Sequence, residues 1–303
     1  MSPQSRGRKQ QRGGTDRGGP PGPDLVIARA VRDACRELDR IDDPLIAEMY
    51  VSETLGVWWG LHVVDADPEV IFGEALVAKA ATTRKPAALG LLRCVAVLGT
   101  ERQRRAAAEA ADALAAGGVA EPAWAGAVGT GRVRAAWAYG DVYGDQTSVL
   151  LAVERSGVEH GVVVLVDHTL GGIAKDAFAT PDPSGVLGDL RGFAGPLVQV
   201  RELSVGEAAA MLYPAFAASD AGPEPPVSED FAANRALALS RVRMLGPSPA
   251  AAPGPVVGRA ERQMIVNGFL AAPAGRDLPA QRAGAPSCSS SSARRRTAAG
   301  RCG

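Results

Sequence analysis

The chain has 303 residues, a formal net charge of zero and 46% hydrophobic residues, enough for a sizeable core in one large or two modest domains. The charge is unevenly distributed, because residues 1–24 and 276–303 are both basic. The part between these ends, residues 25–275, contains 22 Lys and Arg against 30 Asp and Glu, a net charge of −8. An acidic body is untypical of a nucleic-acid-binding domain, and no apolar run is long enough for a signal peptide or a membrane span, so we expect a cytoplasmic protein without membrane contact.

The first half of the chain predicts helices. Residues 1–23 are rich in Gly, Pro and basic residues, which favours a disordered basic tail. Within residues 24–129, Asp followed by Pro marks helix starts at 43–44 and 67–68, and apolar periodicity indicates further helices from Asp24, over Pro86–Leu98 and over Glu101–Ala116. Because the core must be built mainly from Ala, Val and Leu, we expect closely packed antiparallel helical hairpins.

The pattern changes in residues 130–246, where we expect an α+β region. Two β-branched runs, Val149–Val153 and Val162–Val166, predict a hairpin that turns near Gly157. Both runs are apolar at every position, so the sheet should be covered on both faces. A third strand is expected at Leu197–Leu203. The remaining predictions are helices at Val205–Ala218 and Glu229–Leu245, a Pro-rich linker at 247–257, a helix at 258–271 and a disordered tail at 272–303.

The fold class predicted from these elements is α+β. A mostly helical N-terminal half, made of antiparallel helical hairpins, would pack with a small antiparallel sheet and C-terminal helices.

Polar residues flank the predicted hairpin and provide the candidate site. Asp141 and Asp145 precede its first strand, and Asp167 and His168 follow its second, with Thr147 expected to face His168. Three carboxylates and one imidazole suit a divalent metal ion that activates water for hydrolysis. Side chains alternate between the two faces of a strand, so Asp167 and His168 would point in opposite directions unless the strand ends at Val166. A structural hydrogen-bonded cluster and a ligand-binding or partner-binding surface therefore remain as alternatives.

Two further features are candidate sites. Gly171–Gly172 with Lys175 resembles part of an anion-binding loop, although a tight turn explains the glycines equally; no phosphate-binding or dinucleotide-binding glycine motif follows a strand, so no organic cofactor is expected. The pair Trp58–Trp59, with His62 nearby, suggests either packing at an interface between domains or a pocket for a ligand or partner. His160 is expected to be exposed in the hairpin turn. Buried, reduced thiols are expected at two positions, Cys35 and Cys94.

The segments WAYGDVYGDQTSVLLAVE and HGVVVLVDHTLGGIAKDAF resemble a family of uncharacterised proteins of high-GC bacteria, as do the Ala-rich helices before them and EDFAANRALALSRVRML after them. The resemblance covers roughly residues 45–270 and implies no activity, cofactor or site residue. Such proteins continue with a further ordered segment, whereas this sequence ends in AGAPSCSSSSARRRTAAGRCG. We therefore expect a shifted reading frame or a truncation near Arg282.

Three functions are compatible with these patterns. The first is a non-enzymatic interaction or regulatory protein with a protein partner. The second is a metal-assisted hydrolase at the hairpin end, with Asp141, Asp145, Asp167, His168 and Lys175 as the candidate residues. The third is a nucleic-acid accessory protein that makes its contacts through the basic tails.

Overall fold

The computed structural model describes residues 23–61, 67–221, 225–247, 264, 267 and 268. The described residues up to 247 belong to one compact unit, and 264, 267 and 268 belong to a second. In the second unit the described residues Met264, Asn267 and Gly268 are helical, within the helix expected at 258–271. Residues 1–22 of the predicted tail 1–23, the predicted tail 272–303, most of the linker and the expected frame change near Arg282 lie outside the described residues, whereas Pro23 already belongs to a helix.

The N-terminal half is helical, as predicted. Its helices are α1 (Pro23–Leu38), α2 (Pro44–Gly56), α3 (Pro68–Ala81), α4 (Pro86–Leu98) and α5 (Glu101–Ala116). Their starts follow local rules: the side chain of Asp43 accepts hydrogen bonds from the N–H groups of Leu45 and Ile46, and Thr100 forms a capping box with Gln103. The apolar α4 lies at the centre, with α1, α2, α3 and α5 packed around it.

The second half contains an antiparallel sheet and three further helices. The strands are β1 (Arg132–Asp141), β2 (Gln146–Arg155), β3 (Val158–Asp167), β4 (Ile173–Thr180) and β5 (Val198–Leu203), in the order β4-β3-β2-β1-β5. The helices are α6 (Pro183–Phe193), α7 (Val205–Asp220) and α8 (Phe231–Arg243). The α+β class and the position of the sheet after the helical half are therefore confirmed.

The expected β2–β3 hairpin forms, but its register differs from the prediction. Thr147 pairs with Val166 rather than with His168, and Gln146 pairs with Asp167. The strands run up to a two-residue turn at Ser156 and Gly157, whose φ angles are +50° and +84°. Since the displacement is an even number of residues, each side chain stays on the face expected for it.

Sequence reasoning missed β1, β4 and α6. Strand β1 is RVRAAWAYGD, which alternates Arg, Ala and aromatic residues instead of forming a β-branched run, and β4 begins in a segment interpreted as part of a polar cluster. Both strands gain stability mainly from pairing with the hairpin, so their own composition indicates them weakly. Helix α6 carries three glycines, which lower its intrinsic helix propensity.

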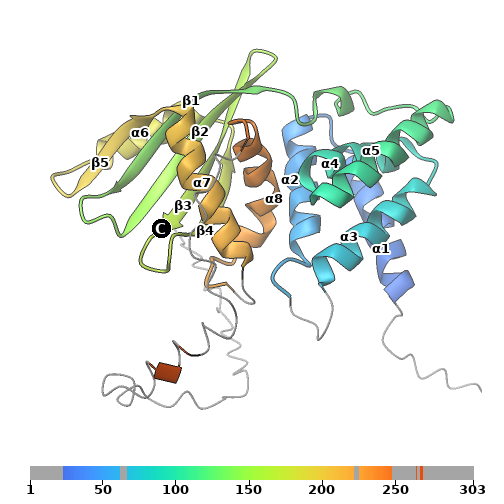
Figure 1. Ribbon diagram of the computed structural model, residues 1–303. Coiled ribbons are helices and arrows are strands. Elements are labelled where there is room, and N and C mark those ends of the chain that lie inside the picture. Colours follow the sequence, from blue (N-terminus) through green and yellow to red (C-terminus); the bar gives the residue numbers. More distant parts are fainter. Residues whose placement is uncertain (1–22, 62–66, 222–224, 248–263, 265–266, 269–303) are drawn as a thin grey trace, which may run out of the picture. The chain divides into compact units, whose positions relative to one another are not determined.

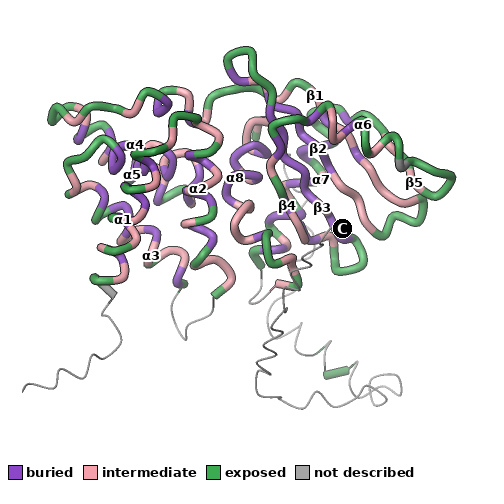
Figure 2. Tube along the Cα trace, turned by 180° about the vertical axis from the view of Figure 1, so that it is seen from behind, coloured by how far each residue is buried: buried purple, intermediate pink, exposed green. Residues whose placement is uncertain are grey.

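Helices cover both faces of the sheet, as the apolar hairpin strands predict (Figure 1). Helices α7 and α8 pack on one face, and α6 packs on the other, where Leu187 contacts Leu150 and Val163. Helix α8 also packs against α2, so the helical half and the sheet share one core, and both helices carry buried residues in Figure 2. In the described part of the chain, no helix combines the length and apolarity needed to cross a bilayer.

Candidate functional site

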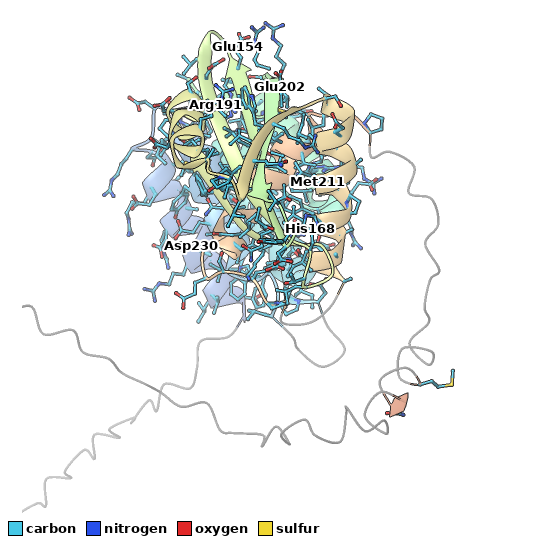
Figure 3. The ribbon with its side chains drawn as sticks, turned by 90° about the vertical axis from the view of Figure 1, so that its left-hand side faces the viewer. Glu154, His168, Arg191, Glu202, Met211 and Asp230 are labelled. Atoms are coloured by element: carbon cyan, nitrogen blue, oxygen red, sulfur yellow. The ribbon has the colours of Figure 1, made fainter. Side chains whose placement is uncertain are left out.

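The polar residues expected at the open end of the hairpin do gather there, opposite the turn next to Glu154 (Figure 3). Asp167 is the centre of this cluster and is almost fully buried. Its Oδ2 accepts hydrogen bonds from Lys175 Nζ at 2.8 Å and from Gln146 Nε2 at 2.9 Å, and its Oδ1 accepts from the Thr169 hydroxyl at 2.6 Å. The bond with Lys175, followed by that with Thr169, lowers the pKa of the Asp167 carboxyl far below its usual range.

Asp141 belongs to the same network but serves the β1–β2 turn. Its carboxylate accepts hydrogen bonds from the backbone N–H groups of Gln146, Tyr143 and Asp145, and these bonds lower its pKa. Gln146 thus connects Asp141, at the end of β1, to Asp167, at the end of β3, and Asp167 is in turn bonded to Lys175 of β4. The carboxylates of both Asp141 and Asp167 therefore already have protein donors.

The other two candidates make different contacts. His168 lies just beyond the end of β3, and its Nε2 is 3.1 Å from the Thr147 hydroxyl. Asp145 contributes its backbone carbonyl, which accepts the N–H of His168 at 2.9 Å. Among the residues the structure describes, no group of three or more His, Cys, Asp or Glu side chains is arranged to hold a metal ion. The metal-assisted hydrolase stays a prediction.

The paired glycines form the β3–β4 turn. Gly171 and Gly172 have φ angles of +90° and +78°, and their N–H groups donate to the backbone carbonyls of His168 and Asp167. Those donors are therefore occupied by the turn itself and do not face an open anion site.

The tryptophan pair follows α2, and only Trp59 contacts the second half; His62 lies outside the described residues. Trp58 stacks on Phe72 with ring centroids 3.8 Å apart. Trp59 packs edge-on against Phe231, and its Nε1 donates to Asp220 at 3.1 Å. The packing interpretation therefore holds for both rings. The two cysteines expected to be buried and reduced, Cys35 and Cys94, are both so.

A second polar cluster lies inside the core and was not anticipated from the sequence. Arg155 Nη2 donates to Glu48 Oε2 at 2.7 Å, and Arg241 donates to both oxygens of the same carboxylate. Glu48 and Arg241 are fully buried, and Arg155 is 6% exposed. Burial by itself raises the pKa of Glu48, but Arg241 and Arg155 outweigh it and lower the pKa. One ionised carboxylate therefore holds two buried guanidinium groups.

His160 completes this cluster and corrects the expectation that it is exposed. It lies in β3 rather than in the turn, is 4% exposed, and its Nε2 accepts a hydrogen bond from Arg241 Nε at 3.1 Å. Burial, together with Arg241 and Arg155, lowers the pKa of His160 to about 4. Because arginine only donates, the neutral imidazole carries its proton on Nδ1.

The signal for this core cluster is present in the sequence but is easily overlooked. Glu48 and Ser52 fall on the same helical stripe as Val51 and Leu55, where only apolar residues are expected. Arg241 interrupts the apolar face of α8 in the same way. A charged residue on a core-facing stripe needs a buried partner of opposite charge, which predicts a pairing without identifying the partner.

The face of α2 that points away from Glu48 and the core lines an open surface groove of about 450 Å³, here called the α2 groove. Ile46, Met49, Tyr50 and Glu53 follow one another at the three- and four-residue spacing of a single helix face, and Ile46 is 50% exposed. The groove is also lined by Glu37 of α1, by Ile41 just after α1, and by Asp230, Ala233 and Asn234 at the start of α8.

The charge around this groove is negative. Burial raises the pKa of Tyr50, and the neighbouring carboxylates of Glu37, Asp33 and Glu53 raise it further. Glu37 is paired with Arg40 at 3.0 Å, whereas Glu53 and Asp230 form no ion pair within the described residues. The α2 groove therefore has an apolar floor and an acidic border.

No protein family, curated protein or solved structure matches this chain.

Proposed function

We propose that this chain is an interaction protein whose α2 groove binds a partner-protein segment with an apolar side chain flanked by Lys or Arg. The single observation that carries the proposal is the combination of the exposed Ile46 and the half-buried Met49 and Tyr50 with the acidic side chains Glu53 and Asp230. An apolar anchor in a groove supplies most of the affinity, and complementary charge at the border supplies specificity and association rate.

The polar cluster at the hairpin end supports a binding role over catalysis. The carboxylate of Asp167 is neutralised by Lys175, and Asp141 is engaged by the backbone of its own turn. Both side chains would have to give up these bonds to act on a substrate.

Selection from a random peptide display library on the purified full chain tests the proposal. We expect enriched peptides to carry Lys or Arg beside an aliphatic or aromatic residue. Glu53→Lys should weaken the binding of a selected peptide roughly fivefold, because an exposed charge contact contributes about 1 kcal/mol. Ile46→Ser should weaken the binding by a similar factor, because apolar burial is lost.

Glu109→Lys is the matched control, because Glu109 is an exposed acid on α5 outside the groove. It should leave peptide affinity unchanged, and added salt should weaken binding to the native chain. Selected peptides without basic residues, or equal effects of the two charge reversals, would refute the proposal.

A further inference from the structure

Strand β5 forms one edge of the sheet and pairs only with β1. The N–H of Val142 donates to the carbonyl of Leu197 at 3.0 Å, which marks this pair as hydrogen-bonded. Because hydrogen-bonded and non-hydrogen-bonded pairs alternate in an antiparallel ladder, the N–H and C=O groups of Val200 and Glu202 point away from β1. Among the described residues, these outward groups have no hydrogen-bond partner.

The opposite edge of the sheet, β4, is covered. The carbonyl of Lys175 accepts the N–H of Ser228 at 2.8 Å, and the N–H of Ala177 donates to the Asp176 carboxylate at 2.8 Å. The hydroxyl of Ser228 also donates to the carboxylate of Asp176. A further strand can therefore add to the sheet at β5 but not along this part of β4.

The small apolar cluster beneath α6 ends at the same open edge. Leu150, Val163 and Leu187 are buried in this cluster, whereas Val200 of β5 packs against it and is only half-buried. Figure 3 looks onto this edge, where Glu202 of β5 lies between α6 and α7. An apolar residue placed beside Val200 would extend the cluster across the edge.

Strand β5 is complementary to itself in one antiparallel register. When Val200 lies opposite Val200 of a second copy, Gln199 lies opposite Arg201 of that copy. Val198 then lies opposite Glu202, so no like charges face each other. The neighbouring register that places Arg201 opposite itself would bring two like charges together, and a shift in the other direction moves Glu202 past the end of β5.

We propose that this chain forms a two-fold dimer in which β5 pairs antiparallel with β5 of a second copy, joining the two sheets into one. The N–H of each Val200 donates to the Val200 carbonyl of the other copy, and the N–H of each Glu202 donates to the Val198 carbonyl. The interface is separate from the α2 groove. Two six-residue strands bury less than an interface of standard size, about 1,600 Å², so the dimer dissociates on dilution.

Sedimentation velocity of the full chain over a range of concentrations tests the proposal. We expect a monomer–dimer equilibrium, and hydrogen exchange at the amides of Val200 and Glu202 should slow as the dimer forms. Val200→Pro removes an N–H that crosses the interface and leaves the bonds between β5 and β1 in place, as proline does on an edge strand. It should weaken dimerisation at least tenfold, because the two-fold axis doubles the loss.

Substitutions at the exposed Gln199 change the dimer in opposite directions. Gln199→Arg places a like charge opposite Arg201 of the second copy and should weaken the dimer about threefold, whereas Gln199→Glu should strengthen it about threefold. The effects are modest because Arg201 already pairs with Glu207 of its own chain. Ala106→Arg is the matched control: it adds the same charge at an exposed position of α5 and should leave the equilibrium unchanged.

A chain that stays monomeric at every concentration would overturn the proposal. Slow exchange at Val200 in that monomer would indicate that another segment of the same chain covers β5, and fast exchange would leave the edge open to a different protein. A dimer that responds neither to Val200→Pro nor to the two Gln199 substitutions would overturn it as well, because its interface would lie elsewhere.

Discussion

His160 illustrates how burial changes the chemistry of a single residue. In the unfolded chain its imidazole takes up a proton near pH 6.5, whereas in the folded chain it does so only near pH 4, because of burial and the neighbouring Arg241 and Arg155. The unfolded state therefore binds more protons between these two pH values, and the stabilising contribution of neutral His160 is lost as the pH falls through this window.

We predict that the native chain loses roughly 3 kcal/mol of unfolding free energy between about pH 6.5 and about pH 4 that a His160→Gln variant does not lose. Glutamine keeps an acceptor for Arg241 and has no proton to gain, so it removes only the titration. Urea unfolding of both proteins across this pH range measures the difference. Parallel stability curves would show that His160 does not titrate as described.

At the scale of elements, the contact between α2 and α8 depends on two small residues. The Ser52 hydroxyl donates to the carbonyl of Ala233 at 2.6 Å and accepts from the N–H of Leu237 at 3.1 Å, two groups that lie four residues apart on α8. One turn later, a Cβ on Gly56 would lie 2.1 Å from the carbonyl oxygen of Ala232. A serine and a glycine therefore allow the two helix backbones to approach closely.

Gly56→Ala should destabilise the protein by about 1–3 kcal/mol or more, because the new methyl group has to push α8 away from α2. Gly188→Ala is the matched control: this glycine lies within α6 with open space around its Cα, so alanine should stabilise by roughly 0.4–1 kcal/mol. Chemical denaturation of the two variants provides the comparison. A Gly56→Ala variant as stable as the native chain would contradict the close approach.

At the scale of residues 23–247, the helical half and the sheet are joined through α8. Arg235 on this helix pairs with Asp220 of α7 and Glu69 of α3, and its guanidinium carbon lies 5.1 Å from the centre of the Trp59 ring. Together with Glu48, Arg155 and Arg241, these contacts connect segments up to 193 residues apart in the sequence. Glu48 of the helical half and its partners Arg155 and Arg241 of the second half would be left as unpaired buried charges if the halves separated.

We therefore expect one cooperative unfolding transition for both halves. In a Trp137→Phe variant the remaining tryptophans are Trp58, Trp59 and Trp124, all in the helical half, so fluorescence reports that half and, through Trp59, its contact with α7 and α8. Its denaturation midpoint should coincide with the midpoint measured by far-UV circular dichroism, which reports both halves. A fluorescence transition separated from the circular dichroism transition would demonstrate independent domains.

The amino-acid sequence by itself determined the local structure. Helix starts at Asp43–Pro44 and Asp67–Pro68, the extent of Glu101–Ala116 and the hairpin around Gly157 all follow from caps, prolines and periodicity, which act over a few residues. The gathering of polar residues at the open end of the hairpin was predictable for the same reason. It is a consequence of one turn.

Only the tertiary structure decided which distant residues meet. The packing of α8 between α2 and the sheet brought Arg241 to Glu48 and His160. Each charged side chain is recognisable in the sequence as a polar residue on an apolar stripe, but its partner depends on how whole elements pack. That choice results from the burial of many apolar side chains together, which no short segment encodes.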